Sequence, residues 1–331
     1  MSSTPQFKFT SFLRTGLKWL PKNKSTKLTD DEDSQMYIVE NDEDELDRQI
    51  VQHYICRLCF DGNYTAPMDD LLKRGAKVLE IGCGPAAWSL EMSSTFPNLQ
   101  FVLQSHSRAS YSPNLHYYRH IKSQFFGFDI EEFNPPQVFP TTVMPQNCFF
   151  EVADATKLPL PYNDNEFDFV FMRSFANVLT TENWPKVLQE LVRITKEGGY
   201  VQVVDANFDF KCLGPNTDIL VRALQKAMRL RGLNPTVATK LPAMLAQAGL
   251  INVHDEMYSA PVGKFDGTKL GMLVKENWAH SVKAYSPLLI KTRVMSEKDI
   301  NRHVGFLFDE VEEHRTREEF CAVYGQKPRA D

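Results

Sequence analysis

The chain has 331 residues, of which 43% are hydrophobic, and its formal net charge is −5. This length and apolar content are enough to bury the core of one large domain or two small ones. The negative charge argues against a nucleic-acid-binding surface spread over the whole protein, and no apolar run reaches the length of a membrane span. We therefore expect no nucleic-acid partner and no membrane span.

The six cysteines are scattered along the chain, and we expect no secretory signal before them. This pattern is typical of a reduced intracellular compartment. We predict a cytoplasmic location, with the nucleus and the mitochondrion as alternatives. Cys56 and Cys59 have the spacing of half a zinc site, but no second pair matches it, so we expect a helical packing pair and no metal.

Residues 1–45 are predicted to be a disordered N-terminal segment that is first basic and then acidic. Residues 1–29 contain basic and aromatic side chains but no acid, whereas residues 30–47 are strongly acidic. Such composition is typical of solvated, poorly ordered chain. The basic part also has the character of a weak mitochondrial presequence or a membrane-surface segment, and it offers a docking arm for a protein partner. We expect the folded domain to span residues 46–331.

Strands and helices are predicted to alternate along this domain. This order predicts a mostly parallel sheet that is covered by helices on both faces. In chain order we expect a helix at 47–60, a strand at 78–81, a helix at 86–94, strands at 147–152 and 167–172, a helix at 183–196, a strand at 200–204, helices at 218–231 and 239–248, a strand at 251–258, a helix after the capping box at 296–299, and a strand at 319–324.

A glycine turn follows the first of these strands. Gly82 and Gly84 have no Cβ atom, so a ligand can lie against bare backbone there, with Cys83 between them. Pro85 is predicted to occupy the first turn of the next helix. A strand, a glycine turn and a helix start together indicate a nucleotide-binding corner.

Two nucleotide ligands fit this corner. The glycines, with Ala87, match the dinucleotide fingerprint in its G-x-G-x-x-A form. Glu80 instead favours S-adenosylmethionine (SAM), because a carboxylate can act on the ammonium group of that ligand but sits badly beside a pyrophosphate.

Acids at successive strand ends favour SAM. Asp129 ends the apolar run at 125–130, where a carboxylate can hold a ribose diol, and Asp154, followed by Ala155, comes after the next strand, where it can accept an adenine N6 proton. Arg173 follows the strand at 167–172 and is expected in the pocket floor. These positions meet at the carboxyl edge of an open α/β sheet. A dehydrogenase would have no use for Asp154 and would need a catalytic domain for which little chain remains.

The chain resembles the class I SAM-dependent methyltransferases, and within them the fungal group related to the global secondary-metabolism regulator of filamentous fungi. The resemblance implies a Rossmann-like α/β fold whose seven-stranded, mostly parallel sheet has helices on both faces and an antiparallel last strand. It also implies SAM as the cofactor. The matching stretches are 47–54, 62–63, 78–88, 96–98, 167–173, 184–185, 196–199 and 323–328. The candidate cofactor-binding residues are Glu80, Gly82, Cys83, Gly84, Asp129, Asp154, Ala155 and Arg173.

Two features depart from the family pattern. Ala86 stands at the position of the third motif glycine, and its methyl group narrows the approach to the methionine end of SAM. In addition, Gly84 and Asp129 are much further apart in sequence than in the family, which marks residues 103–126 as an insertion. A structureless insertion of this size is unusual in a compact domain. It is either a retained intron that is read in frame or a genuine loop beside the cofactor.

We predict a SAM-dependent methyltransferase that acts on an unidentified small-molecule or protein acceptor. The alternative is a SAM-binding regulatory or scaffold protein with little turnover, and a nicotinamide oxidoreductase comes third. No catalytic residue can be assigned from the sequence. Asp205 and Asn207 are the best placed to contact an acceptor, followed by His53 and Tyr54.

Overall fold

The computed structural model describes residues 43–96, 123–130 and 145–330. The N-terminal segment up to residue 42 and residues 103–122 of the predicted insertion lie outside these ranges. The first described element is helix α1 (Glu43–Cys59), which begins close to the predicted domain start at residue 46.

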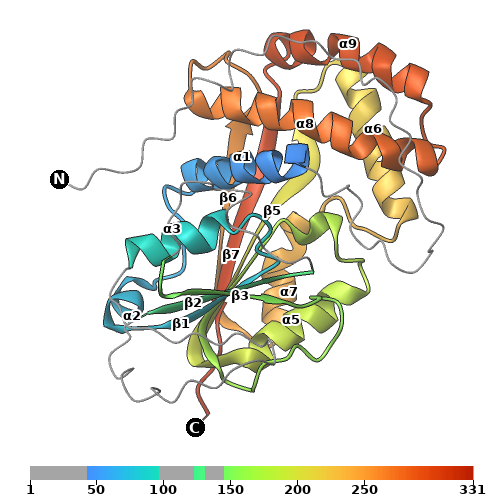
Figure 1. Cartoon of the computed structure of the whole chain (residues 1–331). Helices are drawn as coiled ribbons and strands as arrows, with labels where there is room; N and C mark the ends of the chain where they lie inside the picture. Colours follow the sequence, from blue (N-terminus) through green and yellow to red (C-terminus); the bar gives the residue numbers. More distant parts are fainter. Residues whose placement is uncertain (1–42, 97–122, 131–144, 331) are drawn as a thin grey trace. The chain divides into compact units, whose positions relative to one another are not determined.

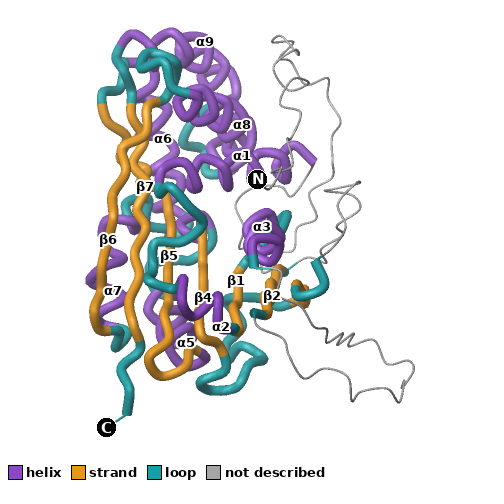
Figure 2. Tube along the Cα trace, turned by 90° about the vertical axis from the view of Figure 1, so that its left-hand side faces the viewer, coloured by secondary structure: helices purple, strands orange, loops and turns teal. Residues whose placement is uncertain are grey.

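Seven strands form one sheet within the described residues, in the order β3-β2-β1-β4-β5-β7-β6. Strands β1 to β5 pair in parallel, and β7 runs antiparallel to both β5 and β6. Figure 2 shows the strands side by side. This confirms the predicted fold class, including the antiparallel last strand. The strands are β1 (Lys77–Ile81), β2 (Gln124–Asp129), β3 (Cys148–Val152), β4 (Phe167–Arg173), β5 (Thr195–Lys211), β6 (Ile251–Pro261) and β7 (Arg317–Gln326).

Helices cover both faces of the sheet, and α3 and α5 lie on opposite sides of the strands (Figure 1). Four others, α1, α6, α8 and α9, pack against one another beyond the carboxyl end of β5 (Figure 1). This helical layer positions the cavity described below. The helices after α1 are α2 (Asp69–Arg74), α3 (Ala87–Thr95), α5 (Asn183–Ile194), α6 (Pro215–Leu230), α7 (Leu241–Gln247), α8 (Lys269–Lys291) and α9 (Glu297–Glu313).

The core lies on the central strands, whose apolar side chains are almost fully buried. Phe169 and Phe171 of β4 are 0% and 1% exposed, and the indole of Trp88 stacks on the ring of Phe171 with 4.3 Å between their centroids. Trp184 of α5 is also buried, so Trp88 and Trp184 are both core residues. Each such aromatic side chain contributes about 1.5–3 kcal/mol by leaving water.

Strand β2 corrects the boundary of the predicted insertion. It begins at Gln124, and residues 124–126 pair in register with residues 77–79 of β1. Phe125 is fully buried, as expected of an apolar side chain on a strand that lies between two others. Ser123 is buried as well, and its hydroxyl donates to the carbonyl of Leu72. In this structure residues 123–126 are therefore part of the domain.

The turn before α3 also differs from the prediction. Helix α3 begins at Ala87, so Pro85 lies in the preceding turn, where the N–H of Ala86 donates to the carbonyl of Cys83. Ala86 caps the helix with a left-handed backbone (φ 56°), a conformation that glycine adopts without strain. Ala86, which stands where the family pattern has a glycine, thus keeps a backbone conformation typical of glycine.

Candidate functional site

The candidate site lies where the strand order reverses. Strand β1 has β2 on one side and β4 on the other, and ligands of open α/β sheets bind beyond the carboxyl ends of the strands at such a point. The glycine turn after β1, Asp129 at the end of β2 and Arg173 at the end of β4 all meet here.

Asp129 is tied directly to the glycine turn. Its Oδ2 accepts a 2.8 Å hydrogen bond from the N–H of Gly84, and its Oδ1 accepts one from the N–H of Ile130. The two bonds fix the carboxylate against the turn. The acid and the glycine, which are distant in sequence, therefore form one corner.

Backbone conformation and close neighbours both favour glycine at these two positions. Both have left-handed backbones, with φ 62° at Gly82 and 51° at Gly84. A Cβ on Gly82 would lie 2.6 Å from the ring of Phe175, and one on Gly84 would lie 2.3 Å from Oε1 of Gln49. The buried Cys83 stands between them and donates its N–H to the carbonyl of Phe128. The turn is therefore a cradle that glycine forms with the least strain.

Glu80 is buried beneath this turn, at 2% exposure. Its Oε2 accepts hydrogen bonds from the N–H and the hydroxyl of Ser89. Burial raises the pKa of Glu80 to about 7, even though the charge of Arg173 and the bonds from Ser89 lower it. A carboxylate in such surroundings gains free energy when a cationic group approaches it.

A short chain of side chains holds Arg173. The guanidinium of Arg173 can only donate, so the 3.1 Å contact between its Nη1 and Nδ1 of His53 makes Nδ1 the acceptor. Nε2 of His53 then carries the proton and donates it to Glu91 over 2.8 Å. Burial lowers the pKa of His53 to about 4, so the ring is neutral at pH 7. His53 therefore positions Arg173.

Asp154 and Ala155 follow β3 at one side of the corner. The carboxylate of Asp154 accepts from the N–H and the hydroxyl of Thr156, so it is oriented by its own loop. Burial opposes ionisation, but these bonds outweigh it and lower the pKa of Asp154. The backbone joins this loop to the corner, because the N–H of Ala153 donates to the carbonyl of Asp129.

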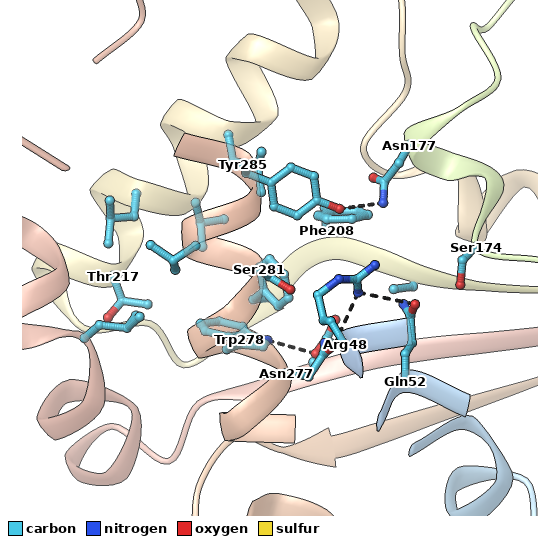
Figure 3. A pocket seen from close by; sticks show the side chains of 18 of the residues that line it. Arg48, Gln52, Ser174, Asn177, Phe208, Thr217, Asn277, Trp278, Ser281 and Tyr285 are labelled. Atoms are coloured by element: carbon cyan, nitrogen blue, oxygen red, sulfur yellow. Dashed lines mark hydrogen bonds between the residues drawn. The ribbon is translucent and has the colours of Figure 1, made fainter. Parts of the chain in front are cut away.

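A cavity of about 80 Å³ lies beside the residues that follow β4, on the side of β5. Figure 3 shows the side chains that line it. A single water needs roughly 10–15 Å³ by the same measure, so the cavity is larger than a packing defect. Ser174, which directly follows Arg173, lines it, and so does Asp205. The side chain of Asp205 is buried and accepts the N–H groups of Ala176 and Ala206. The cavity and the glycine turn thus meet at the residues that follow β4.

Of the four residues expected near an acceptor, Asp205 alone lines this cavity. Asn207 instead donates to Glu319, and Tyr54 stacks edge-on against His53. The sequence did not reveal the polar residues that α8, β7 and the turn after β4 contribute. The missed lining residues include Asn177, Asn277, Ser281, Tyr285 and Glu318. Three of them recur every four residues along α8, which would have indicated a polar stripe had this helix been predicted.

Comparisons with known proteins agree with this geometry. A family model described as a methyltransferase domain matches residues 79–203, which run from β1 into β5. The chain carries a SAM-dependent methyltransferase domain. SAM is therefore its cofactor.

The similar proteins include fungal methyltransferases. The N-methyltransferase verN of Clonostachys rogersoniana is 23% identical over 88% of this chain and 93% of its own length. The methyltransferase pytC of Aspergillus terreus is 22% identical over 87% of this chain and 80% of its own length. Among solved structures, the YcgJ protein of Bacillus subtilis is 17% identical, with a TM-score of 0.47 over 78% of this chain and 94% of that chain.

The described residues contain no group of three or more histidine, cysteine or acidic side chains that could hold a metal ion. None of the helices in these ranges is long and apolar enough to cross a membrane.

Proposed function

We propose that the corner at β1, β2 and β4 binds SAM and that the adjoining cavity holds a small-molecule acceptor. The observation that carries this proposal is the junction of the two sites: Ser174 lines the cavity, while the ring of the next residue, Phe175, lies against Gly82. A methyl donor on the glycine turn and an acceptor in the cavity would therefore be neighbours.

The residues of the corner match the groups that SAM presents. The buried Glu80 suits its ammonium group, and Asp129 suits the ribose hydroxyls, since a carboxylate accepts two hydrogen bonds from a diol. The glycine cradle supplies bare backbone beside them. Asp154 and Ala155 stand where the adenine is expected, and Cys83 and Arg173 complete the proposed set.

Methyl transfer from SAM requires mainly that the protein align the acceptor with the methyl group. Bound SAM supplies a methyl group on a sulfonium, which is already a good leaving group. Holding the acceptor close and in line can account for about 7–11 kcal/mol of a reaction barrier. In this chain the cavity wall performs that task, and the side chains of Phe175 and Gln49 lie close to the two glycines.

Two features support a small molecule over a protein as the acceptor. The cavity is bounded by α1, β5, α6 and α8, and most of its lining is apolar, which is typical of small-molecule sites. Incubation with labelled SAM and either the low-molecular-weight or the protein fraction of a fungal extract tests the choice. We expect label in the first fraction. Label in the protein fraction alone would contradict the proposal.

The relation to the group of the global secondary-metabolism regulator is also a proposal. Its support is the near end-to-end set of matching stretches and the fungal origin of verN and pytC. The printed activity of verN, methylation at nitrogen, extends to this chain only as a hypothesis. The alternative of a SAM-binding scaffold predicts SAM binding with no turnover in either fraction.

A further inference from the structure

The acceptor cavity is rich in groups that attract a positive charge. Asp205 and Glu318 contribute two carboxylates to its wall, at 3% and 5% exposure. The cation in the lining is Arg48, whose Nε and Nη2 both bond to the carboxylate of Glu45 at 2.7 and 2.6 Å. Since Arg48 is paired with Glu45, Asp205 and Glu318 are the acidic groups of the wall that remain for a cationic ligand. Burial raises the pKa of both acids to about 7, and a cation that approaches them favours their ionised form.

A hydrogen-bond acceptor in the same wall has no partner. Asn177 is 6% exposed, and its Nδ2 donates to the hydroxyl of Tyr285. Its Oδ1 is buried and has no hydrogen-bond partner among the described residues. Figure 3 shows Asn177 and Ser174 on the side of the cavity opposite Thr217. A buried oxygen without a donor costs about 1–3 kcal/mol, so an N–H group placed there would be favourable.

The rest of the wall is apolar and aromatic. Trp278 and Phe210 meet edge to face at 4.5 Å, and Tyr285 and Phe208 do so at 6.3 Å. Aromatic faces attract ammonium groups, most strongly where water is excluded. Leucine and valine side chains of α6 and α8 close the opposite end, on the side of Thr217. The cavity therefore has a polar end, where Ser174 and Asn177 lie, and an apolar end beside Thr217.

We propose that the acceptor is a small molecule with a primary or secondary amine on an apolar body, the amine lying between Asp205 and Asn177. This inference rests on the proposed function, because it assigns a substrate class to the same cavity. The placement puts the nitrogen beside Ser174, at the junction with the glycine turn. The apolar body then lies against α6 and α8.

The proposed step balances as follows. Asp205 takes one proton from the ammonium form of the acceptor, and this frees the nitrogen lone pair. The nitrogen attacks the methyl carbon; the N–C bond forms as the C–S bond breaks, and the bonding pair stays on sulfur, leaving a neutral thioether. The product is an N-methylammonium. Burial raises the pKa of Asp205 to about 7, against the backbone N–H groups that lower it, which suits a base that works near neutral pH.

Calorimetry on the full chain with S-adenosylhomocysteine bound tests the inference. The probes are 2-phenylethylamine and 2-phenylethanol, which have the same shape and differ in the amine. We expect the amine to bind about tenfold more tightly or better, and mass spectrometry to find its N-methyl product when SAM replaces S-adenosylhomocysteine. Asp205→Asn should remove the preference. Asp209→Asn changes an exposed acid further along β5 and should retain it.

Glu318→Gln provides a second variant in case Asp205→Asn does not fold, because glutamine can still accept the hydrogen bond from Nε1 of Trp278. It should reduce the preference for the amine as well. Equal affinity for the two probes, or an undiminished preference in the folded variants, would overturn the inference. The same titrations separate the two proposals, since a chain that binds S-adenosylhomocysteine but shows no amine preference disproves only this one. A chain that does not bind S-adenosylhomocysteine disproves the proposed function.

Discussion

The backbone N–H of Gly84 and Oδ2 of Asp129 form a 2.8 Å hydrogen bond between residues 45 positions apart. The bond exists because β1 and β2 pair in parallel and end at the same edge of the sheet. The corner is thus a tertiary assembly in which the acid is held ready by the turn. Each of its parts can be tested separately.

Asp129→Asn should weaken SAM binding. Asparagine can still accept the N–H of Gly84, so the turn stays in place, but the charge that favours a diol is lost. A hydrogen bond to a charged group is worth about 1.5–3 kcal/mol, which corresponds to a roughly 10- to 150-fold loss of affinity by calorimetry. Asp255→Asn on the edge strand β6 is the control and should bind normally. Unchanged affinity of the Asp129 variant would remove this residue from the site.

Ala86→Gly should stabilise the protein. Ala86 has φ 56°, a backbone conformation that costs an L-residue about 1–2 kcal/mol. Glycine avoids this cost but loses about 0.5–1 kcal/mol more conformational entropy than alanine when the chain folds. We expect a gain of about 0.5–1 kcal/mol in the free energy of urea unfolding. Ala87→Gly, one residue into α3, should instead destabilise the protein by up to about 1 kcal/mol. A loss of stability in both variants would show that the left-handed backbone carries no strain.

Glu310→Gln should destabilise the protein in a pH-dependent way. The carboxylate of Glu310, on α9, accepts four hydrogen bonds at the start of α6, from the backbone N–H groups and side chains of Asn216 and Thr217. Burial opposes ionisation, but these bonds prevail and lower the pKa of Glu310 to about 2. Its contribution is therefore complete above the ordinary glutamate pKa, near 4.5, and is lost as the pH falls towards 2.

Urea unfolding at several pH values measures this effect. At pH 7 the Glu310→Gln variant should be less stable than the wild type by about 1–3 kcal/mol, and the difference should shrink between pH 5 and pH 2. Glu313→Gln, an exposed position near the end of the same helix, should show little difference. A deficit that does not depend on pH would mean that the charge of Glu310 is not what stabilises the helix start.

Removal of residues 103–122 should leave a folded, SAM-binding protein. Residues 96–102 and 123 would still connect α3 to β2, and this link is only slightly longer than the roughly 2–6 residues usual in α/β units. Removal of 103–126 should abolish folding, because it also deletes Ser123 and the first three residues of β2. If the shorter deletion folds but no longer binds SAM, the segment is a genuine part of the cofactor site. Matched genomic and transcript sequences decide separately whether it is an intron.

The sheet and the corner could be predicted from the sequence because their signals are local. Each of these strands is a short apolar run, and a polar residue at its end must lie at the carboxyl edge of a parallel sheet, as Glu80 and Asp129 do. Strand β5 was predicted too short, since Ala206 and Phe208 continue it beyond the end of β4 to form the cavity floor.

The cavity could not be predicted, because its wall depends on α8, whose sequence argues against a helix. Gly271 and Pro287 both lie inside it. Gly271 is needed for a tertiary reason: a Cβ there would come within 1.9 Å of the carbonyl oxygen of Gly263, whose N–H donates to Gly271. A residue that lowers helix propensity is thus required by a contact with a segment outside the helix.

The indole of Trp278 stands in the cavity wall and donates its Nε1–H to Glu318 over 2.8 Å. Indole fluorescence responds to the polarity and charge around the ring. Of the other tryptophans, Trp88 and Trp184 are enclosed in the core away from this wall, and Trp19 lies outside the described residues. A molecule that enters the cavity would change the surroundings of Trp278 directly. The protein thereby contains its own optical reporter, with which unlabelled compounds can be screened for the acceptor.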